Sequence, residues 1–136
     1  YERQSKDGVV ALDKIIEALI GPALRLSRNP EKGGAHFMRL LGRLVMEPDD
    51  KIQGLLTEHF KTSLDKFMPA LQRALPNLEP IDFFWRVHYL VGAMVHTMAD
   101  SERIKTISGG VCDPNDTEGN IKRLVSFLVA GLEAES

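Results

Sequence analysis

The chain has 136 residues, with 17 basic and 19 acidic side chains, one cysteine and a formal net charge of −2. This length suits one domain with its own core, and the slightly negative charge excludes a surface built to neutralise phosphates. The single cysteine excludes an internal disulfide and fits a reducing cytoplasm, and no apolar run approaches the roughly 20 residues of a membrane span.

Helix is the only regular structure that the sequence predicts, because no segment alternates polar and apolar residues long enough to make a strand. The first helix is predicted over residues 8–28 and ends in the turn cluster 29–34. Its predicted inward face consists of Val9, Leu12, Ile16, Leu19, Ala23 and Leu26. The predicted second helix turns Phe37, Leu41, Leu44 and Val45 inward.

A third helix is predicted to begin at Pro48-Asp49-Asp50, where proline and acidic residues suit a helix N-terminus. Pro69 interrupts its apolar stripe and predicts a kink or a split at that point. The stripe consists of Ile52, Leu55, Leu56, Phe60, Leu64, Phe67, Leu71 and Leu75.

The segment 81–100 predicts a long helix that is apolar on nearly all sides. One stripe consists of Ile81, Phe84, Trp85, His88, Gly92, Val95 and Ala99. Much of the remaining surface is covered by Phe83, Val87, Leu90, Val91, Met94 and Met98. Because a small domain covers only one side of such a helix, the pattern predicts that the other side meets a second subunit.

The end of the chain predicts one short turn and one long helix. The turn spans residues 103–108 and ends at Gly109-Gly110. Asp113 is the predicted N-cap of the last helix, with Pro114 at its first position and Asp116 at its third. The apolar face of that helix consists of Ile121, Leu124, Val125, Leu128, Val129 and Leu132.

The histidines are the candidate metal ligands: His36, His59, His88 and His96. His88 and His96 are eight residues apart, which is about 12 Å along a helix, so one metal ion cannot bind both on one straight helix. No Glu-x-x-His pair occurs. The sequence therefore favours histidines that are satisfied in a core or a dimer seam, and it predicts no metal and no cofactor. The alternative is a histidine that orients a ligand in an apolar pocket.

The sequence also gives little support to an enzyme. Cys112 precedes the last helix, where a thiolate is favoured electrostatically, but no second cysteine is present to resolve a sulfenic acid. No serine lies in a nucleophile-elbow context, and the paired glycines are isolated turns rather than phosphate loops. What remains is apolar bulk, and methionine and aromatic side chains suit a ligand cavity as well as a core.

Four segments carry a resemblance to a known family: Gly-Pro-Ala-Leu-Arg-Leu (21–26), Phe-Met-Arg-Leu-Leu-Gly-Arg-Leu (37–44), Phe-Trp-Arg-Val-His-Tyr-Leu-Val-Gly-Ala-Met-Val-His-Thr-Met-Ala (84–99) and Ser-Gly-Gly-Val-Cys-Asp-Pro-Asn-Asp-Thr (108–117). They resemble the C-terminal regulatory domain of TetR-family transcriptional repressors, in particular a branch associated with fatty-acid-responsive regulators. The resemblance covers almost the whole chain. It implies an all-α bundle of about five to six helices over residues 1–136. The last two long helices, matching 81–100 and 115–133 here, would pair with their copies in a four-helix dimer seam.

The resemblance also implies a small apolar effector, such as a fatty acid or an acyl thioester, between the earlier helices and helix 81–100. The pocket candidates are Phe37, Met38, Leu41, Phe60, Leu64, Phe67, Trp85, His88 and Tyr89. The candidates for the homodimer seam are Val91, Val95, Met98, Ile121, Leu124, Val125, Leu128 and Leu132. DNA binding is implied only through a helix-turn-helix domain N-terminal to this sequence, in a cytoplasmic protein of which this chain is expected to be a piece.

Two other functions remain open from the sequence. The four histidines and the methionine- and aromatic-rich interior also suit a helical metal- or cofactor-binding bundle or enzyme. A purely structural dimerisation module without a pocket would carry the same apolar helices.

Overall fold

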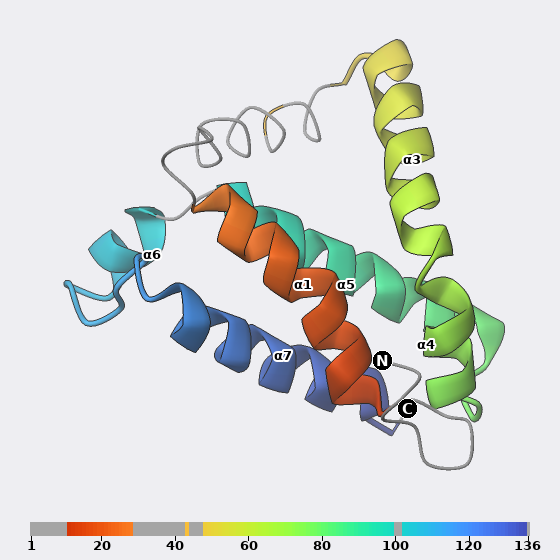
Figure 1. Ribbon diagram of the computed structural model, residues 1–136. Helices are drawn as coiled ribbons and strands as arrows, with labels where there is room; N and C mark the ends of the chain where they lie inside the picture. The colour runs from red at the N-terminus through yellow and green to blue at the C-terminus, as the bar shows by residue number, and fades with distance from the viewer. Residues whose placement is uncertain (1–10, 29–42, 44–47, 100–101, 136) are drawn as a thin grey trace.

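The computed structural model describes residues 11–28, 43, 48–99 and 102–135, and every regular element in these ranges is a helix (Figure 1). The elements are α1 (Leu12–Ser27), α3 (Asp50–Asp65), α4 (Met68–Ala74), α5 (Pro80–Ala99), α6 (Glu102–Ile107) and α7 (Thr117–Glu133). The predicted all-α fold is confirmed. The predicted second helix lies outside the described residues except for Arg43, which is helical.

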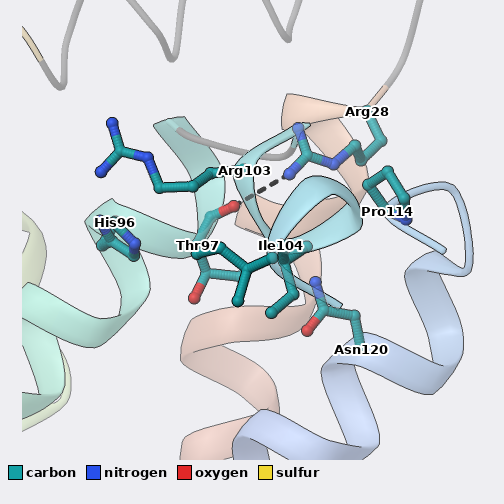
Figure 2. Close-up of a pocket in the computed structure, with 8 residues that line it drawn as sticks. Arg28, His96, Thr97, Arg103, Ile104, Pro114 and Asn120 are labelled. Carbon is teal, nitrogen blue, oxygen red and sulfur yellow. Dashed lines mark hydrogen bonds between the residues drawn. The ribbon is translucent and has the colours of Figure 1, made fainter. Parts of the chain in front are cut away.

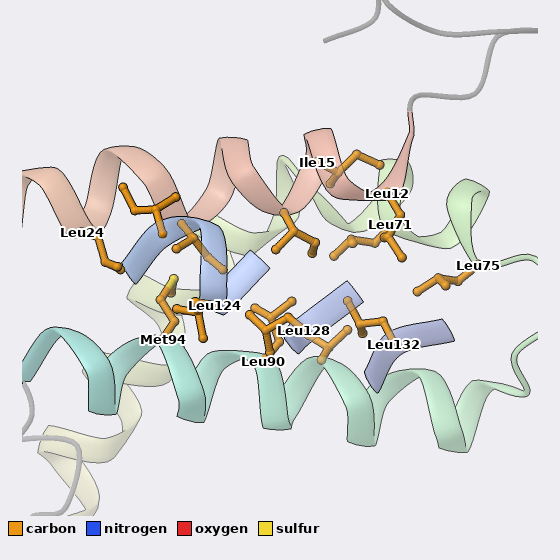
Figure 3. Packing of buried hydrophobic residues seen from close by; sticks show 14 of the residues in the cluster. Leu12, Ile15, Leu24, Leu71, Leu75, Leu90, Met94, Leu124, Leu128 and Leu132 are labelled. Carbon is orange, nitrogen blue, oxygen red and sulfur yellow. The ribbon is translucent and has the colours of Figure 1, made fainter. Parts of the chain in front are cut away.

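The core lies between α1, α5 and α7, and α4 packs against α1 (Figure 1). Figure 3 shows leucine, isoleucine and methionine side chains of these helices directed into the space between them. The largest fully buried apolar side chains are Ile16, Ile20, Leu24, Leu71 and Leu90. Burial of this apolar surface is the main favourable contribution to folding.

The start and the inward face of α1 differ from the sequence expectation. The helix begins at Leu12 rather than at residue 8, after Ala11, which has an extended backbone with φ −60° and ψ 138°. Its buried apolar face consists of Leu12, Ile15, Ile16, Ile20 and Leu24. Leu26, which was expected to point inward, is exposed. Apolar residues of α1 fit two overlapping stripes, and packing against both α5 and α7 selects the stripe that contains Ile16 and Ile20.

The acidic start and the proline break predicted for the third helix are both confirmed. The Asp49 side chain accepts hydrogen bonds from the backbone N–H groups of Lys51 at 2.9 Å and Ile52 at 3.3 Å, as an N-cap does. The helix ends at Asp65, and α4 begins at Met68 with Pro69 in its first turn. A proline is tolerated there because the first N–H groups of a helix have no intrahelical partner.

The N-cap of α7 is Asp116 and not Asp113, which corrects the sequence expectation. Asp116 Oδ1 accepts the backbone N–H of Gly119 at 3.1 Å. Asp113 instead accepts the N–H of Asn115 at 2.9 Å within the preceding turn. The sequence motif therefore identified the right turn, but the helix starts three residues later than the motif predicts.

Gly119→Ala is expected to give no gain in stability, although alanine normally favours helix by about 1 kcal/mol over glycine. A Cβ at Gly119 would overlap the Asp116 side chain, so the cap must rotate away and lose its hydrogen bond, at a cost of about 1 kcal/mol. Gly54→Ala in α3 is the control, because a Cβ at Gly54 meets nothing within 4 Å. Urea unfolding of the two variants measures the difference, and equal stabilisation of both would contradict this role of Asp116.

Two arginines hold the ends of neighbouring helices by donating to carbonyl groups near the helix C-termini. Arg28, after α1, donates from Nη2 to the carbonyl oxygen of Thr97 near the end of α5, at 2.9 Å. Arg86 on α5 donates from Nη1 to the carbonyl oxygens of Leu132 at 2.8 Å and Ala134 at 2.6 Å, at the end of α7. A cation is favoured at these positions because the last carbonyls of a helix carry partial negative charge. These hydrogen bonds join α1 to α5 at one end of the core and α5 to α7 at the other.

An exposed ion pair joins α1 to the first turn of α7. Arg25 Nη2 lies 3.0 Å from Glu118 Oε1. The hydrogen bond to Glu118 raises the pKa of the Arg25 guanidinium above its ordinary value, and desolvation opposes this rise. Because both side chains are largely exposed, the pair contributes little to stability and mainly sets orientation.

Candidate functional site

The face of α5 that points away from the core is apolar. Its large side chains, each more than half exposed, are Ile81, Phe84, Trp85 and Tyr89. The opposite face is buried and consists of Phe83, Val87, Leu90, Met94 and Met98. Isolated exposed apolar residues are ordinary in soluble proteins, but a contiguous group of this kind marks an interaction surface.

Three aromatic rings on this outward face form a cluster. The rings of Trp85 and Tyr89 are stacked, with centroids 5.9 Å apart and an interplanar angle of 28°. The His88 ring meets the Trp85 ring edge to face at 5.6 Å. Tryptophan and tyrosine combine a large apolar area with a polar group, and such residues are enriched at protein interfaces.

The two edges of α5 face different parts of the molecule. Arg86 marks the edge next to α7, because it donates to carbonyls at the end of that helix. Successive residues of an α-helix are rotated by about 100°, so Tyr89 and Ala93 share the Arg86 edge, whereas Phe84 and Val95 lie on the other edge. Figure 1 shows α7 and α3 on different sides of α5. The Phe84 edge therefore points away from α7.

A shallow cavity of about 230 Å³ lies between α5 and α7 on the outward side, and we call it the α5–α7 groove. Its lining consists of Arg86, Tyr89, Leu90, Ala93, Phe127, Leu128, Gly131 and Leu132. Phe127 stands on its rim with 72% of its surface exposed. Apart from Arg86, which is engaged with the end of α7, the lining has no charged side chain. The groove therefore suits an apolar group.

A second cavity, of about 220 Å³, lies at the other end of α5, where α6 meets the start of α7 (Figure 2). Its lining consists of Arg28, His96, Thr97, Arg103, Ile104, Ile107, Pro114 and Asn120. Figure 2 shows the Arg28 guanidinium directed at the Thr97 carbonyl, to which it donates a hydrogen bond. In the structure, Arg28 thus serves to join helices.

The predicted pocket residues do not all come together in one described pocket. Trp85, His88 and Tyr89 do meet, but on the outward face of α5. Leu64 and Phe67 are half-buried and pack against the core at the junction of α3 and α4. Phe37, Met38 and Leu41 lie outside the described residues, as does the side chain of Phe60.

The predicted dimer seam lies partly in the core of the single chain. Five of its residues are buried there: Met98, Ile121, Leu124, Leu128 and Leu132. Val91, Val95 and Val125 are half-buried. Sequence reasoning assigned no role to Phe127, the most exposed large apolar residue of α7. Phe127 is a large apolar residue that stands next to Leu128 in the sequence but outside the apolar stripe of this helix. That position could have identified it as a surface residue.

The remaining candidate ligands are dispersed. Within the described ranges, no three histidine, cysteine or acidic side chains gather closely enough to hold a metal ion. His88 and His96 are exposed on α5, and Cys112 is exposed before α7. His36 and the side chain of His59 lie outside the part of the chain that the structure describes. Among the helices the structure describes, none is long and apolar enough to cross a bilayer.

Comparison with known proteins finds one family and no individual relative. The family model described as "Tetracyclin repressor-like, C-terminal domain" matches residues 17–131, which include all of α3 to α6 and most of α1 and α7. No curated protein and no solved structure matches the chain. Because the match spans most of the sequence and the described fold is all helical, the chain belongs to the TetR family, as its C-terminal ligand-binding and dimerisation domain.

Proposed function

We propose that this chain is the effector-binding and homodimerisation domain of a TetR-like transcriptional repressor. In this proposal a small apolar ligand controls DNA binding by a helix-turn-helix domain N-terminal to the chain, in the cytoplasm. The family match supports the regulatory role, since domains of this family generally dimerise and bind small effectors. The observation that carries the proposal is the apolar outward face of α5, which is exposed in the part of the chain that the structure describes.

The homodimer is proposed to form through the outward faces of α5 and α7. Trp85 and Tyr89 on α5 and Phe127 on α7 border the same groove or lie next to it, so they form one apolar surface. A two-fold dimer buries the same surface of both copies, and aromatic residues at the centre of such an interface contribute most of its affinity. The two helices are those that the family resemblance implies, but the residues are the exposed ones rather than the buried leucines.

The effector is proposed to bind on the other edge of α5, towards α3. Phe84 on that edge is more than half exposed, and so is Leu55 on α3. Val91 and Val95 lie on the same edge and are half-buried. An apolar site with few polar groups suits an alkyl or acyl chain, and we propose a fatty acid or an acyl thioester as the ligand class.

The proposed mechanism couples this effector site to the dimer. Both proposed sites use α5: its Arg86 edge faces α7, and the effector is proposed to bind on the opposite edge. A ligand that binds one placement of α5 more tightly than another shifts the population of dimer arrangements. The free energy of this shift cannot exceed the difference between the ligand's binding free energies for the two placements. Two DNA-reading domains carried by the dimer must stand about 34 Å apart to reach successive major grooves. A change in dimer arrangement therefore suffices to release DNA.

Native mass spectrometry of the purified chain, followed by a thermal-shift titration with dodecanoic acid, tests the proposal. A dimer is expected, and a free ligand concentration of about 100 Kd should raise its stability by about 2.7 kcal/mol, or roughly 10 °C in Tm. Phe84→Asp should abolish this shift, because a charge would stand in the apolar site.

Val111→Asp is the matched control, since Val111 is 86% exposed in the loop after α6, and its ligand shift should equal that of the unaltered chain. A dimer that neither dodecanoic acid nor its coenzyme A thioester stabilises would contradict the effector class and favour a purely structural dimerisation module. Bound metal detected by elemental analysis would favour the metal-binding alternative.

A further inference from the structure

We propose that the α5–α7 groove is a socket for the Phe127 side chain of a second copy, so that two Phe127 rings are exchanged across the dimer. This inference rests on the dimer proposed above and adds the contact that would hold it in register. It concerns a groove and a side chain that lie on the same surface of one chain.

The groove has the size and chemistry to accept a phenyl ring. Leu90 and Leu128 are buried at its base, and the small residues Ala93 and Gly131 leave it open. A Cβ at Gly131 would meet nothing within 4 Å, so no described residue fills the space above this glycine. An apolar cavity of about 150 Å³ accepts benzene, and the groove, at about 230 Å³, is larger.

Two exposed aromatic side chains stand on the rim, and Phe127 is better suited than Tyr89 to fill the groove of a second copy. Tyr89 is already stacked on Trp85 within its own helix. Phe127 makes no ring contact among the described residues and is 72% exposed. Its large apolar surface is therefore available for burial by another molecule.

A second copy of this chain is the occupant that these features select. The groove is continuous with the outward α5 face, and it carries both a projecting ring and the space to receive one. In a two-fold interface the contact made by one copy is repeated by the other, so two exchanged rings fill two grooves and the assembly closes at a dimer.

The test measures the dimer Kd of the full 136-residue chain by sedimentation velocity. Gly131→Leu fills the groove from within and should raise the Kd at least about tenfold, while the variant keeps the helical signal of the unaltered chain because leucine is a better helix former than glycine. Gly54→Leu is the matched glycine control in α3, where a Cβ also meets nothing within 4 Å, and its Kd should be unchanged.

Phe127→Ala removes the projecting ring and should also raise the Kd at least about tenfold. Ile107→Ala, which truncates another exposed apolar side chain on α6, is its control. The double variant Phe127→Ala/Gly131→Leu should be weakened by much less than the product of the two single effects, because both remove one contact.

The outcomes separate this inference from the proposed function. If Trp85→Glu dissociates the dimer while Gly131→Leu and Phe127→Ala leave the Kd unchanged, the α5 face stands and the exchanged ring is overturned. If none of the three variants changes the Kd, the dimer uses another surface and both proposals fail. A chain that is monomeric at micromolar concentration also overturns both.

Discussion

Leu128→Asp is expected to unfold the chain rather than to dissociate a folded dimer. Leu128 is 6% exposed and lies in the core between α1, α5 and α7 (Figure 3). The substitution removes a buried leucine, worth about 2–3 kcal/mol, and forces a carboxylate into apolar surroundings without a partner. The sum, about 5 kcal/mol or more, is comparable to the whole stability of a small domain.

Circular dichroism and urea unfolding check this result. The variant should lose most of its helical signal or its cooperative transition at 25 °C. Ser126→Asp adds the same charge two residues away on an exposed part of α7, and its stability should change by no more than about 0.5 kcal/mol. A Leu128→Asp variant that stayed folded as a monomer would show that Leu128 faces the partner, as the sequence had suggested.

Hydrophobic periodicity predicted the helices of this chain well because it depends on local spacing. The long helix at 81–100 is α5 (Pro80–Ala99), and the split at Pro69 separates α3 from α4. Proline and capping residues act within one helical turn, so their effects can be predicted without knowledge of the tertiary contacts. The start of α1 was missed because apolar residues continue upstream of Leu12 and no capping side chain marks the boundary.

The sequence also separated α5 into two apolar stripes, but periodicity cannot say which stripe faces the chain's own core. Residues of the buried face, such as Met98, were predicted at the dimer seam, and Trp85 and Tyr89 of the outward face were predicted in the pocket. The packing of α1 against α5 and α7 decides the question, because it covers the aliphatic stripe. Residues with a polar group on an aromatic ring tolerate partial exposure better than aliphatic ones do.

The same reasoning applies to α7. Its most regular apolar stripe contains Ile121, Leu124, Leu128 and Leu132, and such a stripe satisfies a core and a dimer seam equally well. In the single chain α1 packs against this stripe, so the proposed seam uses the exposed flank of α7 that carries Phe127.

Trp85→Glu is expected to dissociate the proposed dimer without unfolding the chain. Trp85 is more than half exposed in the single chain, so its replacement removes little from the core. In the dimer its ring would be buried beside Tyr89 and the groove, and a glutamate there would be desolvated without a partner. Loss of a central tryptophan together with burial of a charge should raise the dimer Kd by at least about 100-fold.

Sedimentation velocity and circular dichroism, applied to the same sample, measure the two effects separately. The variant should sediment as a monomer at micromolar concentration while it keeps the helical signal of the unaltered chain. Ile107→Glu is the control, because it places the same charge on an exposed apolar position of α6, outside the α5–α7 surface. A Trp85→Glu variant that remained a tight dimer would exclude the outward α5 face as the seam. Since Trp85 and Phe84 occupy adjacent positions on α5, such a result would favour Trp85 on the effector side of the helix instead.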